Sequence, residues 1–134
     1  MALKLKKGVM EMVAEAHREI ETISAKEAIS LKDDPNLVLV DLRDIRELNR
    51  DGRIPGAFHA PRGMLEFWVD PESPYHKPIF AEEKTFIIHC ASGWRSLLAT
   101  QTLQRMGLKP VRNLAGGFSA WKAAGGPVEE AKSR

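Results

Sequence analysis

Short runs of apolar residues alternate along the chain with segments that have the spacing of amphipathic helices. Residues 37–40 are all apolar, and residues 84–89 are a run rich in β-formers that ends immediately before the sole cysteine, Cys90. A strand without polar partners is typical of the interior of a sheet that is covered on both faces. The sequence therefore predicts two central strands, over residues 37–40 and 84–89.

Helical spacing appears in several of the other segments. Over residues 8–22 the apolar side chains fall on one face and the acidic side chains fall elsewhere. Ser24, with Glu27 three residues later, has the pattern of a capping box and predicts the start of a short helix. Further helices are expected over residues 45–49, from residue 95 to a stop at Gly107, and after the glycine turn at residues 115–117.

Shorter strands complete the pattern, at residues 21–23, 58–59 and 110–114. The alternation of strands and helices predicts an α/β sandwich around a mainly parallel sheet. Residues 61–80 are less regular, because four prolines exclude a long helix or a central strand there. The same segment holds five large apolar residues, which argue against disorder. It is either a packed excursion with one short helix or a lid over an active site.

The composition narrows the class of protein. The chain has 134 residues, enough for one domain, and 20 basic against 18 acidic residues give a net charge of +2. That balance favours neither nucleic acid nor a membrane as a partner. An acidic residue interrupts the early apolar positions, and no stretch approaches the roughly 20 apolar residues of a membrane span. A single cysteine forms no internal disulfide, so we expect a cytoplasmic protein.

Residues 84–96 run from a predicted strand through Cys90 and a glycine-containing turn into a predicted helix. This order indicates the chemistry of Cys90. It places the thiol at the carboxyl end of a strand and beside a helix N-terminus, where α/β sheets bind ligands and backbone N–H groups favour anions. Such surroundings stabilise a thiolate, which predicts a nucleophile for a sulfur or phosphorus centre. The alternative is a small, buried apolar side chain, as is common for cysteine.

The loop after Cys90 is the candidate substrate-binding segment. Its backbone amides can surround an anion or a terminal sulfur, and Gly93 relieves the steric cost of the turn. Arg95 lies five positions after the cysteine, and its fork of N–H donors suits an oxyanion. We therefore expect the binding loop to consist of Ala91, Ser92, Gly93, Trp94 and Arg95.

Three motifs taken together resemble the rhodanese family. The first is Val40-Asp41-Leu42-Arg43 with the later Gly52-Arg53-Ile54-Pro55-Gly56-Ala57, the second is the Cys90 loop, and the third is Leu114-Ala115-Gly116-Gly117-Phe118-Ser119-Ala120-Trp121. They occur in the family's order and at its spacing, over roughly residues 22–125. One departure is Arg53, which stands where the family often has a histidine.

The resemblance implies a rhodanese-like three-layer α/β/α sandwich with a mainly parallel five-stranded sheet, and a sulfurtransferase. Cys90 would take a sulfane sulfur from a donor such as thiosulfate, hold it as a persulfide and pass it to cyanide or another thiophilic acceptor. The amides of residues 91–95 would point at the outer sulfur. No metal and no organic cofactor is required. Two alternatives stay open: a non-catalytic interaction module, and a carrier that exchanges sulfur with a specific protein donor or acceptor.

Loop length separates the chain from the phosphatases and arsenate reductases related to rhodaneses. Those enzymes carry a Cys-x5-Arg loop, wide enough for a tetrahedral oxyanion. Here the arginine is at the fifth position after Cys90, and the sixth position is Ser96. The shorter loop favours sulfur over phosphate.

Further residues have supporting roles in this interpretation. Asp41 and Arg43 resemble the family's structural pair near the base of the site, and a scaffold role is expected for them. Arg62 either approaches the pocket and binds an anionic donor or lies on the surface. His89 precedes the cysteine on its strand, so alternation points it away from the side of Cys90 and argues against a general base.

The resemblance divides the chain into three parts. Residues 22–127 form the rhodanese-like domain, and residues 128–134 are a polar tail that we expect to fray. Residues 1–21 are a helical extension outside the family core. This extension caps the domain, forms a homodimer or docks a partner, and the sequence does not choose among these roles.

Overall fold

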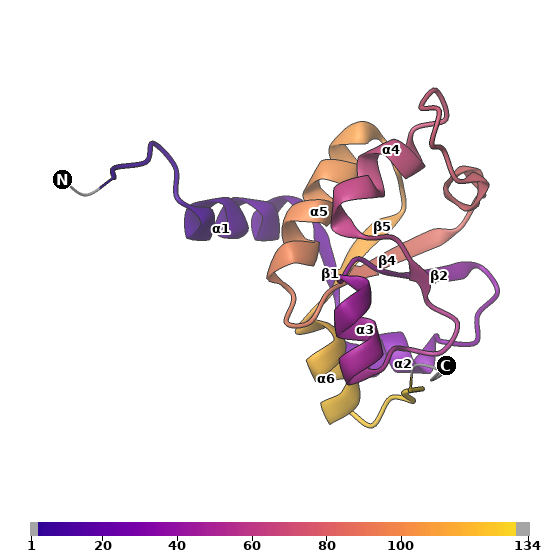
Figure 1. Cartoon of the computed structure of the whole chain (residues 1–134). Coiled ribbons are helices and arrows are strands. Elements are labelled where there is room, and N and C mark those ends of the chain that lie inside the picture. The colour runs from indigo at the N-terminus through magenta and orange to yellow at the C-terminus, as the bar shows by residue number, and fades with distance from the viewer. Residues whose placement is uncertain (1–2, 131–134) are drawn as a thin grey trace.

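The computed structural model describes residues 3–130 (Figure 1). Helices and strands alternate along the chain, as the apolar pattern predicts. In chain order the elements are α1 (Val9–Glu19), β1 (Glu21–Ile23), α2 (Ala25–Ser30), β2 (Leu37–Asp41), α3 (Ile45–Asp51), β3 (Phe58–His59), the 3-10 turn η1 (Arg62–Met64), α4 (Leu65–Val69), the 3-10 turn η2 (Pro78–Ala81), β4 (Thr85–His89), α5 (Trp94–Met106), β5 (Val111–Leu114) and α6 (Gly117–Ala123).

The five strands form one sheet in the order β1-β5-β4-β2-β3. Every pair of neighbouring strands is parallel, so the sheet is parallel throughout, where the sequence predicted a mainly parallel one. The central strand is β4, and its last residue, His89, lies opposite Asp41, the last residue of β2. The segments that follow β2 and β4 therefore emerge side by side at the carboxyl edge of the sheet.

Both faces of the sheet are covered, which gives the three layers that the resemblance implied (Figure 1). The alternation of side chains along β4 shows how the faces are divided: Phe86 and Ile88 join an apolar cluster with α4 and α5. Ile87, between them, points the other way and packs in a second cluster with Trp121 of α6 and with residues of α2. These two clusters hold the sheet between its helices.

The irregular segment of residues 61–80 is a packed excursion. It contains η1, α4 and the start of η2, and its Leu65, Val69 and Phe80 are buried in the cluster on the α5 face. The ring of Trp68 packs edge-on against Phe58 at a centroid distance of 6.0 Å. These contacts explain why a segment with four prolines is nevertheless ordered.

Two capping motifs fix the starts of short helices. The Ser24 hydroxyl accepts a hydrogen bond from the Glu27 N–H at 3.1 Å, as predicted for α2. A complete capping box forms at α3, where Asp44 and Glu47 each bind the other's backbone N–H. This second box was not predicted, although the two residues have the required spacing in the sequence.

The helical extension and the C-terminal tail differ in how they are fixed. The second half of α1 packs on α5, where Glu19 binds Gln101 and Arg105, while the first half projects from the body of the protein (Figure 1). The tail was expected to fray from residue 128. Instead, Glu129 exchanges two backbone hydrogen bonds of 2.9 Å with Arg53, and the side chains of the two residues form an ion pair. The part of this expectation that concerns residues 131–134 lies outside the described residues.

Within residues 3–130, none of the helices is both long and apolar enough to cross a membrane.

Candidate active site

Cys90 lies where the chain turns from the central strand β4 into helix α5. Its residue surface is only 1% exposed, and its side chain belongs to the cluster on the α5 face of the sheet. Gly93 caps the helix in a left-handed conformation with φ of 108°, which a residue with a Cβ adopts only under strain. The thiol thus stands between a strand end and a helix N-terminus, as the sequence pattern predicted.

Two groups contact the Cys90 sulfur directly. The Gly93 N–H donates a hydrogen bond to Sγ at 3.1 Å, and the Ser96 hydroxyl oxygen lies 3.4 Å from Sγ. A backbone N–H directed at sulfur favours a negative charge there, whether on a thiolate or on a persulfide. The first turn of α5 supplies both contacts, so the dipole of this helix acts in the same direction.

Ser96 connects the sulfur to a buried amide. Its hydroxyl is 2.6 Å from Oδ1 of Asn113 on β5 and 3.2 Å from the carbonyl oxygen of Gly93. Because a hydroxyl carries a single hydrogen, donation to Asn113 leaves a lone pair of Ser96 for the S–H of a protonated Cys90. When the sulfur is negative, the same hydrogen can turn toward it. Neither Ser96 nor Asn113 was among the predicted site residues, since no local spacing joins positions 96 and 113.

The start of α6 holds the backbone of the cysteine loop through two hydrogen bonds. The N–H of Phe118 donates to the carbonyl of Cys90 at 2.8 Å, and the N–H of Ser119 donates to the carbonyl of Ala91 at 3.0 Å. Gly117 is essential to this approach, because a Cβ there would lie 2.5 Å from the Cys90 carbonyl oxygen. The glycine motif of the C-terminal segment therefore does packing work against the cysteine loop.

The predicted binding loop has one unexpected partner, Glu47. Arg95 places its two terminal nitrogens 2.9 Å from the two carboxylate oxygens of Glu47, in a bidentate ion pair. The hydrogen bond to Glu47 is the main reason that the pKa of Arg95 is raised, and the nearby Cys90 adds to it less. In return, Arg95 lowers the pKa of Glu47. The arginine expected to receive an oxyanion is thus already bound to a carboxylate.

The other loop residues differ in exposure. Ser92 and Trp94 are exposed, Ala91 is half-buried and Gly93 is buried. Arg62 follows β3 and forms an ion pair of 2.7 Å with Glu66, one helical turn ahead. The sequence left open whether Arg62 binds an anionic donor or lies on the surface. In either case its guanidinium already has a carboxylate partner.

Asp41 and Arg43 form a buried cluster with His89 on the other face of the sheet. Both members of the ion pair are 1% exposed, with Arg43 Nη2 at 2.8 Å from Asp41 Oδ2, and His89 Nε2 lies 3.3 Å from the same oxygen. The guanidinium also donates to the Gly52 carbonyl at 2.9 Å and stacks on the Phe118 ring at 4.2 Å. This cluster therefore fits the scaffold role predicted for the pair.

The pKa of Asp41 reflects its position. Burial alone would raise the pKa of this carboxyl, but the contacts with His89 and Arg43 outweigh burial and lower the pKa far below its usual value. The carboxylate is consequently ionised throughout the physiological range. His89 faces Asp41 and points away from the side of Cys90, as strand alternation predicted.

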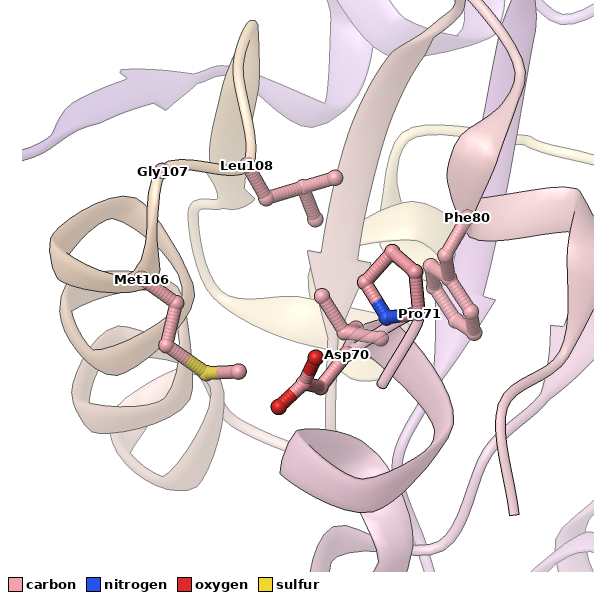
Figure 2. A pocket seen from close by; sticks show the side chains of 7 residues that line it. Asp70, Pro71, Phe80, Met106, Gly107 and Leu108 are labelled. Carbon is pink, nitrogen blue, oxygen red and sulfur yellow. The ribbon is translucent and has the colours of Figure 1, made fainter. Parts of the chain in front are cut away.

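Two hollows lie at opposite ends of α5. A cavity of about 200 Å³ adjoins the cysteine loop and is lined by Ser92, Trp94 and Asn113 together with His17 of α1, so the N-terminal extension reaches the neighbourhood of the loop. Figure 2 shows the other, about 410 Å³, between the end of α4 and the end of α5. Asp70 and Met106 line this second cavity, far along the helix from Cys90.

Comparison with known families agrees with this architecture. The model of the rhodanese-like domain matches residues 24–124, which is most of the chain. The chain belongs to the rhodanese family. The matched region runs from the start of α2 to the end of α6, while α1 and β1 lie before it.

Individual relatives carry names from two classes of enzyme. The chain is 32% identical over 105 residues to a putative sulfurtransferase of Bacillus subtilis, covering 78% of this chain and 90% of that protein. It is 29% identical over 120 residues to the dual specificity phosphatase Cdc25 of Arabidopsis thaliana, covering 83% and 79%. A solved structure from Rhodopseudomonas palustris, of unknown function and described as a possible tyrosine phosphatase, shares 53% identity with a TM-score of 0.93, over 96% of this chain and 99% of that one.

Proposed function

We propose that this rhodanese is a sulfurtransferase that carries a sulfane sulfur as a persulfide on Cys90. The observation that carries the proposal is the hydrogen bond from the Gly93 N–H to Sγ, at the first turn of α5. This donor and the helix dipole stabilise negative charge at the sulfur both before and after it accepts a second sulfur. The relative from Bacillus subtilis is named a putative sulfurtransferase, in agreement with this chemistry.

The reaction has two displacement steps. The Cys90 thiolate attacks the outer sulfur of a donor such as thiosulfate, the S–S bond of the donor breaks, and sulfite leaves with the electron pair. The product is a Cys90 persulfide, which bears one negative charge. A thiophilic acceptor such as cyanide then attacks the outer sulfur, forms thiocyanate and releases the Cys90 thiolate.

Intact mass spectrometry tests this proposal directly. Incubation with excess thiosulfate should add the mass of one sulfur atom, and cyanide should remove it. Cys90→Ser serves as the control and should gain no sulfur. A wild-type chain that takes no sulfur from thiosulfate, from polysulfide or from a protein persulfide would overturn the proposal and leave the interaction module.

A protein phosphatase is the second candidate, because two of the similar proteins are named or described in that way. Two observations weigh against it: the arginine follows the cysteine by five positions, and its fork is bound to Glu47. A phosphatase of this kind uses such a fork to hold the phosphoryl oxygens. We expect no Cys90-dependent hydrolysis of p-nitrophenyl phosphate or of a phosphotyrosine peptide. Turnover that disappears in Cys90→Ser would favour the phosphatase instead.

The proposal has two forms, which differ in the sulfur donor that the protein uses. A carrier would accept sulfur from a protein donor and turn over thiosulfate very slowly, whereas a general enzyme would use both. The hollow that His17 and Trp94 line supports an approach of the partner beside α1. Comparing persulfide formation from thiosulfate and from a protein persulfide separates these two forms of the proposal.

A further inference from the structure

Three arginines lie near the carboxyl edge of the sheet, and two of them, Arg62 and Arg95, were candidates to receive an anionic donor. Each of the three is bound to a carboxylate. Arg95 pairs with Glu47 at 2.9 Å, Arg62 with Glu66 at 2.7 Å, and Arg43 with Asp41 at 2.8 Å. Each ion pair is locally neutral. These arginines consequently provide no free positive charge for a dianion such as thiosulfate.

The carboxylate of the Arg95–Glu47 pair is held in place by further contacts. Glu47 receives both terminal nitrogens of Arg95, and its Oε2 accepts the Asp44 N–H at 2.9 Å as part of the capping box of α3. The box orients this carboxylate before any donor arrives, so it is not a surface side chain that swings freely. Only 19% of its side-chain surface is exposed.

We infer that Glu47, by neutralising Arg95, selects against sulfane sulfur donors of higher negative charge, so that thiosulfate loses more from its presence than a donor with one negative charge. This inference rests on the proposed sulfurtransferase function and adds the donor class to it. The physical reason is that the energy between Glu47 and a donor scales with the donor's charge. Glu47 cancels the attraction that Arg95 would exert on an anion, and the attraction lost is twice as large for a dianion as for a monoanion at the same position.

The test compares thiosulfate with methanethiosulfonate, its monoanionic analogue. Cys90 removes the outer sulfur from each, and sulfite or methanesulfinate leaves with the electron pair. The rate measured is kcat/KM for the donor, from thiocyanate formation with cyanide in excess. Because both steps are displacements at one thiol, this parameter reports the sulfur-accepting step alone.

Glu47→Gln is the decisive variant, because glutamine preserves the capping box while it removes the charge. We expect kcat/KM to rise about tenfold for thiosulfate and about threefold for methanethiosulfonate. The logarithm of the first factor is about twice that of the second, as the two charges require. Arg95→Gln leaves the charge of Glu47 unpaired and should lower kcat/KM about tenfold for thiosulfate and about threefold for methanethiosulfonate. The double variant restores the local neutrality and should lie within about twofold of the wild type for both donors.

Glu19→Gln provides the matched control. Glu19 pairs with Arg105 at the far end of α5, so the substitution makes the same charge change roughly 15 Å or more along the helix. It should leave both rates within about twofold.

The possible outcomes are distinct. If Glu47→Gln leaves both rates unchanged or lowers both by one factor, the pair only supports the fold and the inference is overturned, while the sulfur on wild-type Cys90 still upholds the function. If neither donor adds sulfur to Cys90 in any variant, the proposed function fails and the inference fails with it. If thiosulfate gains more than methanethiosulfonate and the double variant reverses the gain, the inference stands.

Discussion

Adjacent residues of one strand end supply two buried polar clusters that behave in opposite ways. His89 points to one face of the sheet and joins Asp41 and Arg43, whereas Cys90 points to the other face and joins Ser96 and Asn113. In the first cluster, opposite charges are paired, and Arg43 also binds a backbone carbonyl and an aromatic ring. In the second, the sulfur has one backbone donor and one hydroxyl that can change its direction.

The two clusters therefore have different roles, although His89 and Cys90 are adjacent in sequence. The His89 cluster stabilises the fold, and the Cys90 cluster carries out the proposed chemistry. The Asp41–Arg43 ion pair is closed to solvent, with both side chains 1% exposed, and it fixes the strand ends. A sulfur that is only partly satisfied gains contacts when it becomes negative. Substitutions in the His89 cluster should therefore change the free energy of unfolding, and those in the Cys90 cluster should change the rate of sulfur transfer.

The largest effect is expected for Cys90→Ser. A serine hydroxyl is not a sulfur nucleophile, so persulfide formation and thiocyanate production should fall to background. The free energy of unfolding should change little, because serine has nearly the same volume and can accept the Gly93 N–H bond. Full activity in this variant would show that Cys90 is not the residue that carries sulfur.

Asp41→Asn should have the largest effect on stability. The substitution leaves the buried Arg43 without its counter-charge, which costs about 3–5 kcal/mol. Urea unfolding followed by tryptophan fluorescence measures this loss. Asp51→Asn, in the exposed ion pair with Arg50, is the control and should hardly shift the midpoint. Equal shifts in the two variants would contradict the scaffold role.

Ser96→Ala should reduce sulfur transfer about 10- to 100-fold, because a hydrogen bond to a charged sulfur contributes about 1.5–3 kcal/mol. Thr100→Val is the matched control, since the Thr100 hydroxyl binds the Ser96 carbonyl one turn further along α5 and does not contact the sulfur. The control should lose some stability and keep its rate of persulfide formation. A normal rate in Ser96→Ala would remove this hydroxyl from the chemistry.

The smallest effect is a dependence of stability on pH. The pKa of Asp41 is lower in the folded chain than in the unfolded one, so its contribution is present above the unfolded value of about 3.9 and is lost as the pH falls. Between pH 5 and pH 3 Asp41 should account for about 1 kcal/mol of lost stability. The comparison of wild type with Asp41→Asn isolates this part. Parallel pH profiles for the two proteins would show that the carboxyl is not perturbed.

Much of the architecture was predictable because its signals are local. The apolar run at residues 37–40, the β-formers before Cys90 and the Ser24 cap each depend on residues close in sequence, and all three appear where predicted. The orientation of His89 followed from strand alternation alone. The position of the thiol between a strand and a helix required no knowledge of distant segments.

The partners of the loop were not predictable in this way. Arg95 meets Glu47 across 48 positions, and Ser96 meets Asn113 across 17, with a helix and a turn between them. The pairing of Glu129 with Arg53 likewise joins residues that only the folded chain brings together. A single sequence shows which side chains could bind an anion, but not which of them a carboxylate has already bound.

The brace that α6 provides ties the chemistry to the completion of folding. The N–H groups of Phe118 and Ser119 bind the carbonyls of Cys90 and Ala91, in the same loop whose Gly93 N–H donates to the sulfur. Phe118 and Ser119 each lie 28 positions after the residue whose carbonyl they bind. A nascent chain that includes Cys90 but not yet Phe118 has the thiol without the hydrogen bonds that position its loop. The reactivity of this sulfur therefore reports that α6 has docked.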